Sequence, residues 1–311
     1  MSAHSVPIPT VPARPRVTFG HLTDMKAHSE PIVMVTAYDY PSAQIADAAG
    51  VDIVLVGDSA AMTVLGYDST VPVTVDEMLM LTAAVRRGLR HPLLVADLPF
   101  GSYEVSDEQA VATALRFIKD AGADAVKIER GGTSVERARA IVAAGIPVMG
   151  HVGLTPQTAA SIGGYRAQGR TAEEAHVVFH SARALQNAGC FALVFEAIPS
   201  EAAAAMMPLL EVPVIGIGAG PATDGQVLVF HDLLGIYDGH VPRFVKRYAE
   251  LRAPMIAAVA AYAEDVRTHR YPQPEHEYAM PRAETQLLMG LLPEPARSRD
   301  AGNRSTAPST A

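Results

Sequence analysis

Short apolar runs, rich in β-branched residues, recur along the chain and alternate with longer segments that carry helix signals. The runs are apolar at successive positions, which is typical of parallel strands that are covered on both faces. The pattern therefore predicts a series of βα units. Eight runs are expected to form strands: 32–37, 53–57, 93–97, 125–129, 147–152, 192–196, 214–219 and 227–230.

The segments between these runs contain the residues that typically start and end helices. Residues 74–77, 106–109 and 171–174 have the spacing of a capping box, in which the first and fourth side chains bind each other's backbone amides. Pro156 suits a first helical position, where no amide hydrogen is needed. Glycines in "DAAGVD", "DAGAD", "AAGIP" and "NAGC" can end helices in the left-handed conformation. Helix, glycine and strand thus follow one another repeatedly.

The number and spacing of these units predict a (β/α)8 TIM barrel, an α/β fold. About eight units in roughly 250 residues is the usual size of such a barrel. A doubly wound open sheet is the main alternative, but its first strand should lead into a Gly-rich turn. The corresponding segment here, "VTAYDYPSA", contains no glycine. The barrel is therefore the favoured architecture.

The barrel domain is expected over residues 21–275, with flexible N- and C-terminal arms. The Pro-rich stretch 1–20 predicts a flexible arm because it offers little to bury. Residues 243–271 have the pattern of one or two amphipathic helices that close the barrel. Residues 276–292 predict a short helical extension, whose apolar face is equally suited to an oligomer contact. Residues 293–311 predict a disordered tail.

Composition argues against several classes of partner. The 25 basic and 33 acidic residues give a formal charge of −8 without any Lys/Arg block, so neither nucleic acid nor a polybasic membrane contact is expected. The one cysteine, Cys190, excludes an internal disulfide and fits a reducing compartment. The sequence has neither a run of roughly 20 apolar residues nor the apolar core of a signal peptide. We therefore expect a cytoplasmic protein.

Acidic residues end several of the predicted strands. Asp58, Asp97 and Glu129 end the second, third and fourth runs, and Glu196 and Asp232 follow later ones. In a barrel all these ends meet at one rim, which is where the fold places its chemistry. The first three acids would raise one another's pKa unless a cation lay among them, and hard oxygen ligands favour Mg²⁺. A helix cap or a surface ion pair explains any single acid more simply, but three on adjacent strands favour a metal site.

Lys127 and Glu196 are candidate functional groups at the same rim. Lys127 lies two residues before Glu129 and hence on the same face of its strand, where a buried ammonium needs an anionic partner. A charge clamp is the favoured role, and an aldolase-like Schiff-base nucleophile is the alternative. Glu196 ends the sixth run beside apolar residues, which suits a general base. A helix-dipole contact or a loop ion pair is the simpler role for this carboxylate.

Longer stretches of the sequence resemble one enzyme family. They include "VTAYDYPSAQIADAAGVDIVLVGDS", "LLVADLPFGSY", "AGADAVKIERG", "GHVGLTPQT", "IGGYRAQGR" and "PVIGIGAGPATDGQVLVFHDLLG". In this order they resemble the 3-methyl-2-oxobutanoate hydroxymethyltransferase (ketopantoate hydroxymethyltransferase) family over roughly residues 17–275. The terminal arms and "RAETQLLMGLL" lie outside the resemblance, so nothing about function is carried over to them.

The resemblance implies a homodecameric (β/α)8 barrel that makes 2-dehydropantoate for pantothenate and coenzyme A biosynthesis. Its substrates would be 3-methyl-2-oxobutanoate and 5,10-methylenetetrahydrofolate. Mg²⁺ would polarise the 2-oxo acid, a base would remove the proton on C3, and the enolate would attack the methylene carbon of the folate. The implied site residues are Asp58, Asp97 and Glu129 around Mg²⁺, Ser59 and Lys127 at the substrate together with Asp58 and Asp97, and Glu196 as the base.

Three further features have more than one possible role. His151 ends the fifth run and could donate a hydrogen bond to the bound substrate, or it could be structural. The Gly-rich loop with Arg166 and Arg170 suits a lid or an anchor for the glutamate carboxylates of the folate. The segment "GIGAG" (216–220) is typical of a phosphate site, but neither substrate needs one, so close packing and pterin access are preferred. The sequence does not identify the residues that contact the folate.

Two other functions are kept as alternatives. A Mg²⁺-dependent lyase or mutase for 2-oxo acids, of the isocitrate lyase or phosphoenolpyruvate mutase type, also carries acids at the ends of barrel strands. Such enzymes usually rely on a catalytic cysteine or an acidic gating loop, whereas Cys190 precedes a strand. A non-catalytic barrel that serves as a scaffold would have no need to keep the acids and Lys127 together.

Overall fold

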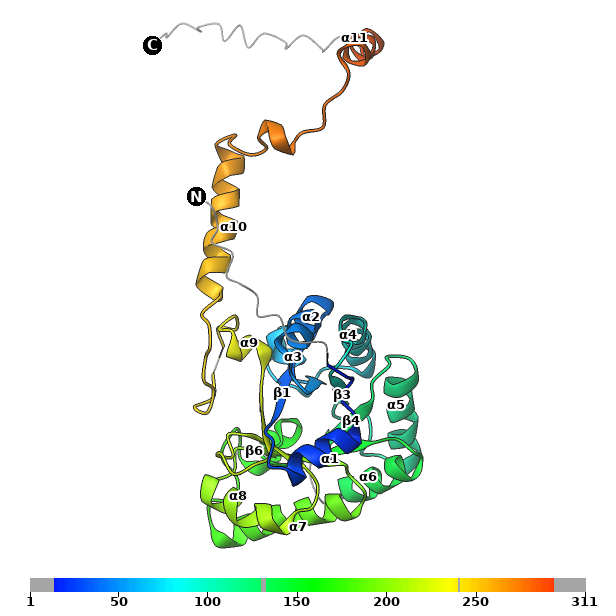
Figure 1. Ribbon diagram of the computed structural model, residues 1–311, viewed down its shortest axis with the longest axis vertical. Coiled ribbons are helices and arrows are strands. Elements are labelled where there is room, and N and C mark those ends of the chain that lie inside the picture. Colours follow the sequence, from blue (N-terminus) through cyan, green and yellow to red (C-terminus); the bar gives the residue numbers. More distant parts are fainter. Residues whose placement is uncertain (1–13, 130–132, 240, 294–311) are drawn as a thin grey trace, which may run out of the picture. The chain divides into compact units, whose positions relative to one another are not determined.

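Eight parallel strands close into a barrel in the computed structural model, which describes residues 14–129, 133–239 and 241–293. Each strand pairs with its neighbours in chain order, and β8 pairs with β1 to complete the ring (Figure 1). The predicted TIM barrel is confirmed, and the doubly wound alternative is wrong. The strands are β1 (Ile32–Thr36), β2 (Ile53–Val56), β3 (Leu93–Asp97), β4 (Ala125–Glu129), β5 (Val148–Gly153), β6 (Ala192–Glu196), β7 (Val214–Ile217) and β8 (Gly225–Leu228).

The eighth strand begins two residues earlier than the sequence predicts. β8 starts at Gly225, whereas the apolar run suggests a strand over 227–230. Gly225 aligns with Ile32 of β1, and a Cβ on Gly225 would lie 2.3 Å from the carbonyl oxygen of Ile32. The closing contact of the barrel therefore requires glycine, which a search for β-branched runs overlooks. The apolar residues after Leu228 lead instead into a short helix.

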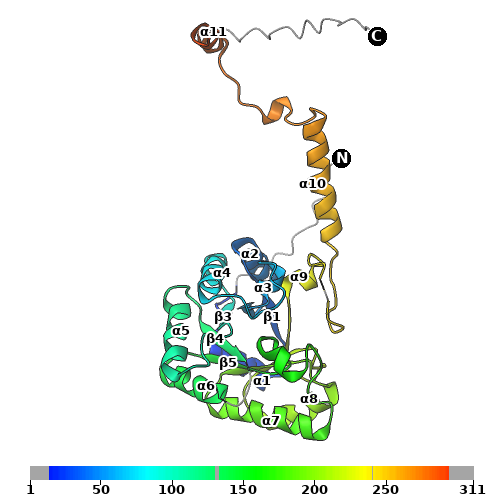
Figure 2. The same ribbon diagram turned by 180° about the vertical axis from the view of Figure 1, so that it is seen from behind.

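Helices surround the ring of strands, as the opposite views in Figures 1 and 2 show. The side chains of Thr74, Ser106 and Thr171 each accept a hydrogen bond from the amide three residues later, as predicted. The reciprocal bond that completes a capping box is present only at 74–77 among these three sites, because Gln109 and Glu174 accept amides from the residues before the caps. These caps satisfy amides that a helix leaves unpaired at its start. The covering helices are α2 (Tyr40–Ala49), α4 (Val75–Gly88), α5 (Asp107–Lys119), α6 (Ser134–Ala143), α7 (Ala172–Asn187) and α8 (Ser200–Met206), which continues into η2 (Met207–Leu209).

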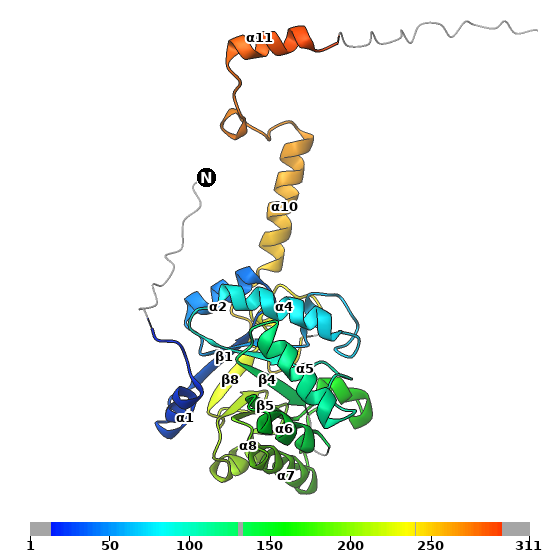
Figure 3. The same ribbon diagram turned by 90° about the vertical axis from the view of Figure 1, so that its right-hand side faces the viewer.

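One further helix, α1 (Phe19–Ala27), lies at the end of the barrel where the strands begin (Figure 3). Leu22 and Met25 of this helix are buried and belong to the same apolar cluster as the residues inside the barrel. Because the interior would otherwise open to water at this end, α1 acts as its floor.

Hydrogen bonds fix the chain before α1 to loops that precede the strands. The guanidinium of Arg14 donates to two carbonyl oxygens ahead of β2, at 2.6 and 2.5 Å. The amide of Val17 donates to a carbonyl oxygen ahead of β3 at 2.8 Å. Of the flexible arm predicted over 1–20, residues 1–13 lie outside the described residues, and the remainder is held by these contacts.

The core has two apolar layers, one on each face of the sheet. In β2, Val54 and Val56 belong to the cluster between the sheet and the helices, whereas Ile53 and Leu55 belong to the cluster inside the barrel. Successive residues of a strand point to opposite faces, so a strand buried on both faces is apolar at every position. This packing accounts for the continuous apolar runs in the sequence.

Three short helices lie after strands at the other end of the barrel. They are α3 (Ala60–Thr63) after β2, the 3₁₀ segment η1 (Pro156–Ile162) after β5, and α9 (Phe230–Leu233) after β8. Together with the strand ends they carry the polar residues described below.

The described residues from Pro254 onward form a second compact unit. The helices of this part of the chain are α10 (Arg252–Arg267) and α11 (Arg282–Leu291), with η3 (Pro274–His276) between them, and none of the residues of α10 or α11 is buried. Closure of the barrel by residues 243–271 stays a prediction. The predicted limits of the barrel domain and of the helical extension stay predictions, and the tail predicted over 293–311 lies outside the described residues from 294 on. No helix of the described chain is long and apolar enough to cross a membrane.

If α1 is the floor of the barrel, Leu22→Ala should lower the free energy of unfolding by about 2–5 kcal/mol, the usual range for a buried leucine. Chemical denaturation measures this change. Val33→Ala is the control, because Val33 on β1 is 49% exposed and its loss should stay below about 1 kcal/mol. Equal losses in the two variants would contradict the role given to α1.

Candidate active site

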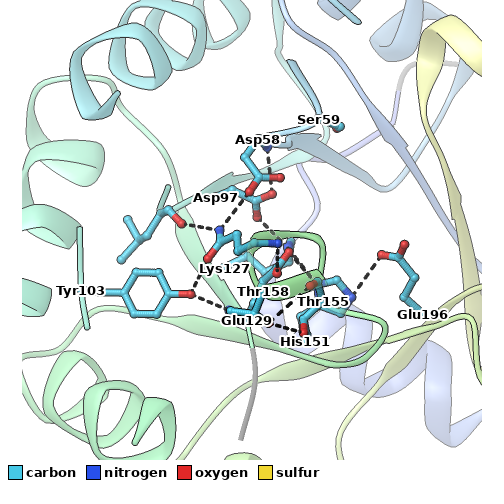
Figure 4. A network of polar contacts seen from close by, with 12 residues as sticks. Asp58, Ser59, Asp97, Tyr103, Lys127, Glu129, His151, Thr155, Thr158 and Glu196 are labelled. Carbon is cyan, nitrogen blue, oxygen red and sulfur yellow. Dashed lines mark hydrogen bonds and ion pairs between the residues drawn. The ribbon is translucent and has the colours of Figure 1, made fainter. Parts of the chain in front are cut away.

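Polar residues form the uppermost layer of the barrel interior. In β3, the inward-facing Leu93 and Val95 belong to the interior apolar cluster, and Asp97 is next on the same face. The layer lies at the carboxyl ends of the strands, so it coincides with the rim predicted from the sequence. At the corresponding level on neighbouring strands lie Lys127 and Glu129 of β4, His151 of β5 and Glu196 of β6 (Figure 4).

Asp58 and Ser59 enter this layer directly after β2. The amide of Asp58 donates to Oδ2 of Asp97 at 3.0 Å, and Ser59 Oγ lies 2.8 Å from the hydroxyl of Tyr38. A Cβ on Gly57 would lie 2.8 Å from Ser59 Oγ and 3.6 Å from Asp97 Oδ2. Glycine at this position therefore lets the two polar groups approach, which explains why the strand ends in Gly-Asp-Ser.

The ammonium of Lys127 lies among the acids. Its Nζ is 2.9 Å from Asp97 Oδ1 and 3.8 Å from Glu129 Oε1. Burial by itself would lower the pKa of Lys127, but Asp97, Glu129 and Asp58 raise it above its usual value. The side chain is therefore a fixed cation. This state suits the predicted charge clamp and not the Schiff-base nucleophile, which requires a neutral amine.

Gln157 joins the acids into one network, and the sequence analysis missed it. Its Nε2 donates to Asp58 Oδ2 at 2.9 Å, and its backbone amide donates to Glu129 Oε2 at 3.1 Å. Its Oε1 accepts a 2.6 Å hydrogen bond from the hydroxyl of Tyr103. All four side chains are buried. Gln157 and Tyr103 lie in the quoted motifs "GHVGLTPQT" and "LLVADLPFGSY", so the resemblance was the signal that could have identified them.

Asp58 and Asp97 have fewer positive or donating partners than two buried carboxylates need. The pKa of Asp58 is raised well above its usual range by burial and by Glu129 and Asp97. Burial also raises the pKa of Asp97, although Lys127 opposes the shift. Asp97 Oδ1 lies 2.9 Å from the ammonium of Lys127, and Asp97 Oδ2 accepts the amide of Asp58. Two adjacent hard oxygen donors in this state fit a divalent cation.

Glu129, the third predicted metal ligand, has both carboxylate oxygens engaged. Oε1 faces His151 Nδ1 at 3.3 Å and Lys127 at 3.8 Å, while Oε2 accepts the amide of Gln157. Burial opposes ionisation, but the hydrogen bond from His151 and the nearby positive charge lower the pKa of Glu129. Within the described residues, no three acidic, histidine or cysteine side chains are arranged to hold a metal ion. Binding of Mg²⁺ by all three acids therefore stays a prediction.

His151 connects the acid network to Glu196. Its Nε2 lies 3.2 Å from Glu196 Oε2, on the opposite side of the ring from Glu129. Burial and Lys127 would lower the pKa of His151, but hydrogen bonding to the two glutamates raises it to about 9. The imidazolium therefore holds Glu196 at the edge of the layer. The side chain of Glu196 keeps 15% of its surface exposed, more than the acids behind it.

Two adjoining cavities open at this end of the barrel. An inner cavity of about 130 Å³ contains the polar layer, with Lys127 and Glu129 in its wall. An outer cavity of about 740 Å³ is lined by Met62, Leu154, Phe244 and other largely apolar groups. The walls that both cavities share are formed by Ser59, Thr70, Pro156, Glu196, Val229, Asp232, Pro242 and Phe244. A small acid in the inner space and a larger molecule in the outer one would thus meet beside Glu196.

The remaining candidate residues do not line the inner cavity. Arg166 lines the outer cavity, while Arg170 does not. In "GIGAG", Gly218 has a φ of 66° and lies in the wall of the outer cavity, where a Cβ would be 2.5 Å from the ring of Phe244. The close packing preferred for this segment is therefore present.

The chain is similar in sequence to known proteins over most of its length. Residues 16–274 match the family model described as ketopantoate hydroxymethyltransferase. A 3-methyl-2-oxobutanoate hydroxymethyltransferase from Moorella thermoacetica is 55% identical over 265 residues, which is 85% of this chain and 98% of that protein. One from Geobacillus kaustophilus is 50% identical, over 86% of this chain and 95% of that protein.

Solved structures with the same fold belong to more distant proteins. Phosphonopyruvate hydrolase in complex with oxalate and Mg²⁺ superimposes with a TM-score of 0.57 at 13% identity, over 88% of this chain and 95% of that one. 2,3-Dimethylmalate lyase, a member of the phosphoenolpyruvate mutase/isocitrate lyase superfamily, gives 0.52 at 17% identity, over 88% and 98%. At these identities the likeness concerns the barrel fold alone.

Replacing Lys127 by methionine tests the electrostatic role of the ammonium. We expect the free energy of unfolding to fall by about 3–5 kcal/mol at pH 8 in EDTA, because buried carboxylates lose their cation. The raised pKa of Lys127 keeps this side chain charged between pH 5 and 8, so any pH dependence in that range comes from the acids around it. The pKa values of Asp58 and Asp97 are raised, so acid protonates them and the loss should shrink toward pH 5.

Denaturation curves at the two pH values measure this difference, with Lys119→Met on the exposed face of α5 as the control. A loss for Lys127→Met that is independent of pH would contradict the assignment.

Proposed function

Because the chain belongs to the ketopantoate hydroxymethyltransferase family, we propose that it transfers a hydroxymethyl group from 5,10-methylenetetrahydrofolate to 3-methyl-2-oxobutanoate. The product is 2-dehydropantoate. The observation that carries the proposal is the position of Glu196, a carboxylate in the wall between a small chamber lined by charged side chains and a large, mostly apolar cavity. This position suits a base that acts on one substrate while the other is adjacent.

The inner cavity suits the 2-oxo acid. Its volume of about 130 Å³ is appropriate for a five-carbon acid, and Lys127 supplies a fixed positive charge for the carboxylate. Ser59 places a hydroxyl in the same wall. Asp58 and Asp97 would hold Mg²⁺, which supplies Lewis-acid polarisation of the keto group when bound. Glu129 would then orient Lys127 and His151 through its contacts with both side chains, in addition to any contact with the ion.

Glu196 is placed to remove the proton from C3 of the 2-oxo acid. Its carboxylate faces the chamber from β6, and His151 holds it by the 3.2 Å ion pair. A general base must lie within about 3 Å of the proton it takes, and Lys127 and Glu196 line the same small cavity, so an acid anchored at Lys127 would lie beside Glu196. The proton resides on Glu196 after transfer, and the electron pair is left on the enolate.

The outer cavity suits the folate. Carbon–carbon bond formation joins C3 of the enolate to the methylene carbon as the bond from that carbon to a folate nitrogen breaks. Water then attacks the same carbon and displaces the remaining folate nitrogen, which takes up a proton. These steps give the hydroxymethyl group and release tetrahydrofolate. No electrons pass to or from a redox cofactor in these steps.

The alternative of a lyase or mutase that uses a cysteine receives no support from the site. Cys190 is buried, and burial raises its pKa to about 12. It therefore does not supply the thiolate that such chemistry needs. The homodecameric assembly that the resemblance implies and the cytoplasmic location expected from composition stay predictions.

Glu196→Gln should abolish deuterium exchange at C3 of 3-methyl-2-oxobutanoate, because the amide cannot accept the proton. NMR of the substrate methine in D₂O measures the exchange. We expect a loss of at least about 100-fold, with binding of the acid retained, and no change in Glu201→Gln at the exposed start of α8. Exchange that persists in Glu196→Gln would remove Glu196 as the base.

Mg²⁺ binding should release protons, because the raised pKa of Asp58 leaves part of this carboxyl protonated until a cation binds. Calorimetry in buffers of different ionisation enthalpy measures the number released. It should be larger near pH 5.5 than at pH 8, and smaller in Asp58→Asn. If Mg²⁺ binds but releases no protons at pH 5.5 or at pH 8, the ion does not bind at Asp58.

A further inference from the structure

Asp232 is a buried carboxylate that the steps above leave without a role. The residue is 7% exposed, and Oδ1 accepts no hydrogen bond from the residues that the structure describes. It lies in α9 directly after β8, at the same end of the barrel as the acid network. In the sequence it follows the apolar run "VLVF" in the same way as the other acids follow theirs.

The position of Asp232 points to a ligand in the outer cavity. Asp232 belongs to the wall that the two cavities share, together with Glu196. Most of the outer wall is apolar or aromatic, including Met62, Tyr165 and Phe244. A flat, largely apolar ligand with a polar edge would fit such a space, and Asp232 is the acid available for that edge besides the proposed base.

The electrostatics of Asp232 favour a ligand that donates hydrogen bonds. Burial raises the pKa of this carboxyl, and Arg247 opposes the shift only in part. A buried carboxylate without donors is costly, whereas two N–H groups from a ligand would stabilise the ionised form. A ligand that donates a hydrogen bond to Asp232 Oδ1 would therefore gain affinity from this contact.

The pterin ring of a folate presents such a pair of donors. Its N3–H and 2-amino groups lie on one edge and point the same way, which matches the two oxygens of a carboxylate. We propose that Asp232 binds this edge of the pterin and so selects the folate co-substrate; the inference rests on the function proposed above. Arg243, which is exposed and lines the same cavity, would suit the anionic glutamate tail of such a ligand.

Two assays separate this role from the chemistry on the 2-oxo acid. Asp232→Asn keeps the shape of the side chain but replaces one acceptor by a donor. We expect kcat/KM for 5,10-methylenetetrahydrofolate to fall about 10- to 100-fold, the range for a lost hydrogen bond to a charged group. Deuterium exchange at C3 of 3-methyl-2-oxobutanoate, measured without folate, should fall by a much smaller factor than transfer does. Asp238→Asn, an exposed acid paired with Arg252, is the matched control.

A folate analogue gives a second readout that a structural role would not alter. The original protein should use a 2-desamino methylenetetrahydrofolate about 10- to 100-fold less efficiently than the natural compound, and Asp232→Ala should use the two alike. Equal losses of exchange and transfer in Asp232→Asn, unchanged transfer, or continued discrimination by Asp232→Ala would each overturn the proposal. Absence of C3 exchange in the original protein would instead refute the proposed function, and this inference with it.

Discussion

The polar layer of the barrel depends on compensation of buried charge. Four carboxylates, on Asp58, Asp97, Glu129 and Glu196, lie with two cations, Lys127 and His151, at the top of an apolar interior. When all are ionised the layer carries two negative charges in excess, and burial raises the pKa of Asp58 and of Asp97. A divalent ion at these two acids would balance the excess, and an anionic substrate would then find Lys127 already fixed.

The sequence predicts the barrel because strands buried on both faces leave continuous apolar runs, and it predicts the rim because acids end those runs. Its errors have physical causes. The start of β8 is missed because the closing contact needs Gly225 instead of a β-branched residue. The stretch before α1 looks unstructured because backbone carbonyls, which leave no pattern in a sequence, hold it in place.

For the site, strand position predicts which groups meet but not how they are paired. Glu129 was expected beside the metal, yet its oxygens face His151 and Gln157. Gln157 escaped notice because a neutral amide in a short 3₁₀ segment gives no charge signal, although it is the group that connects two of the acids. Side-chain orientation depends on such neighbours, which only the folded chain brings together.

A crystal structure with Mg²⁺ and 3-methyl-2-oxobutanoate tests the central claim most directly, because it locates both reacting groups. The account predicts the substrate carboxylate at Lys127, the ion at Asp58 and Asp97, and C3 within about 3.5 Å of a carboxylate oxygen of Glu196. Substrate bound in the outer cavity, or with C3 turned away from Glu196, would contradict it.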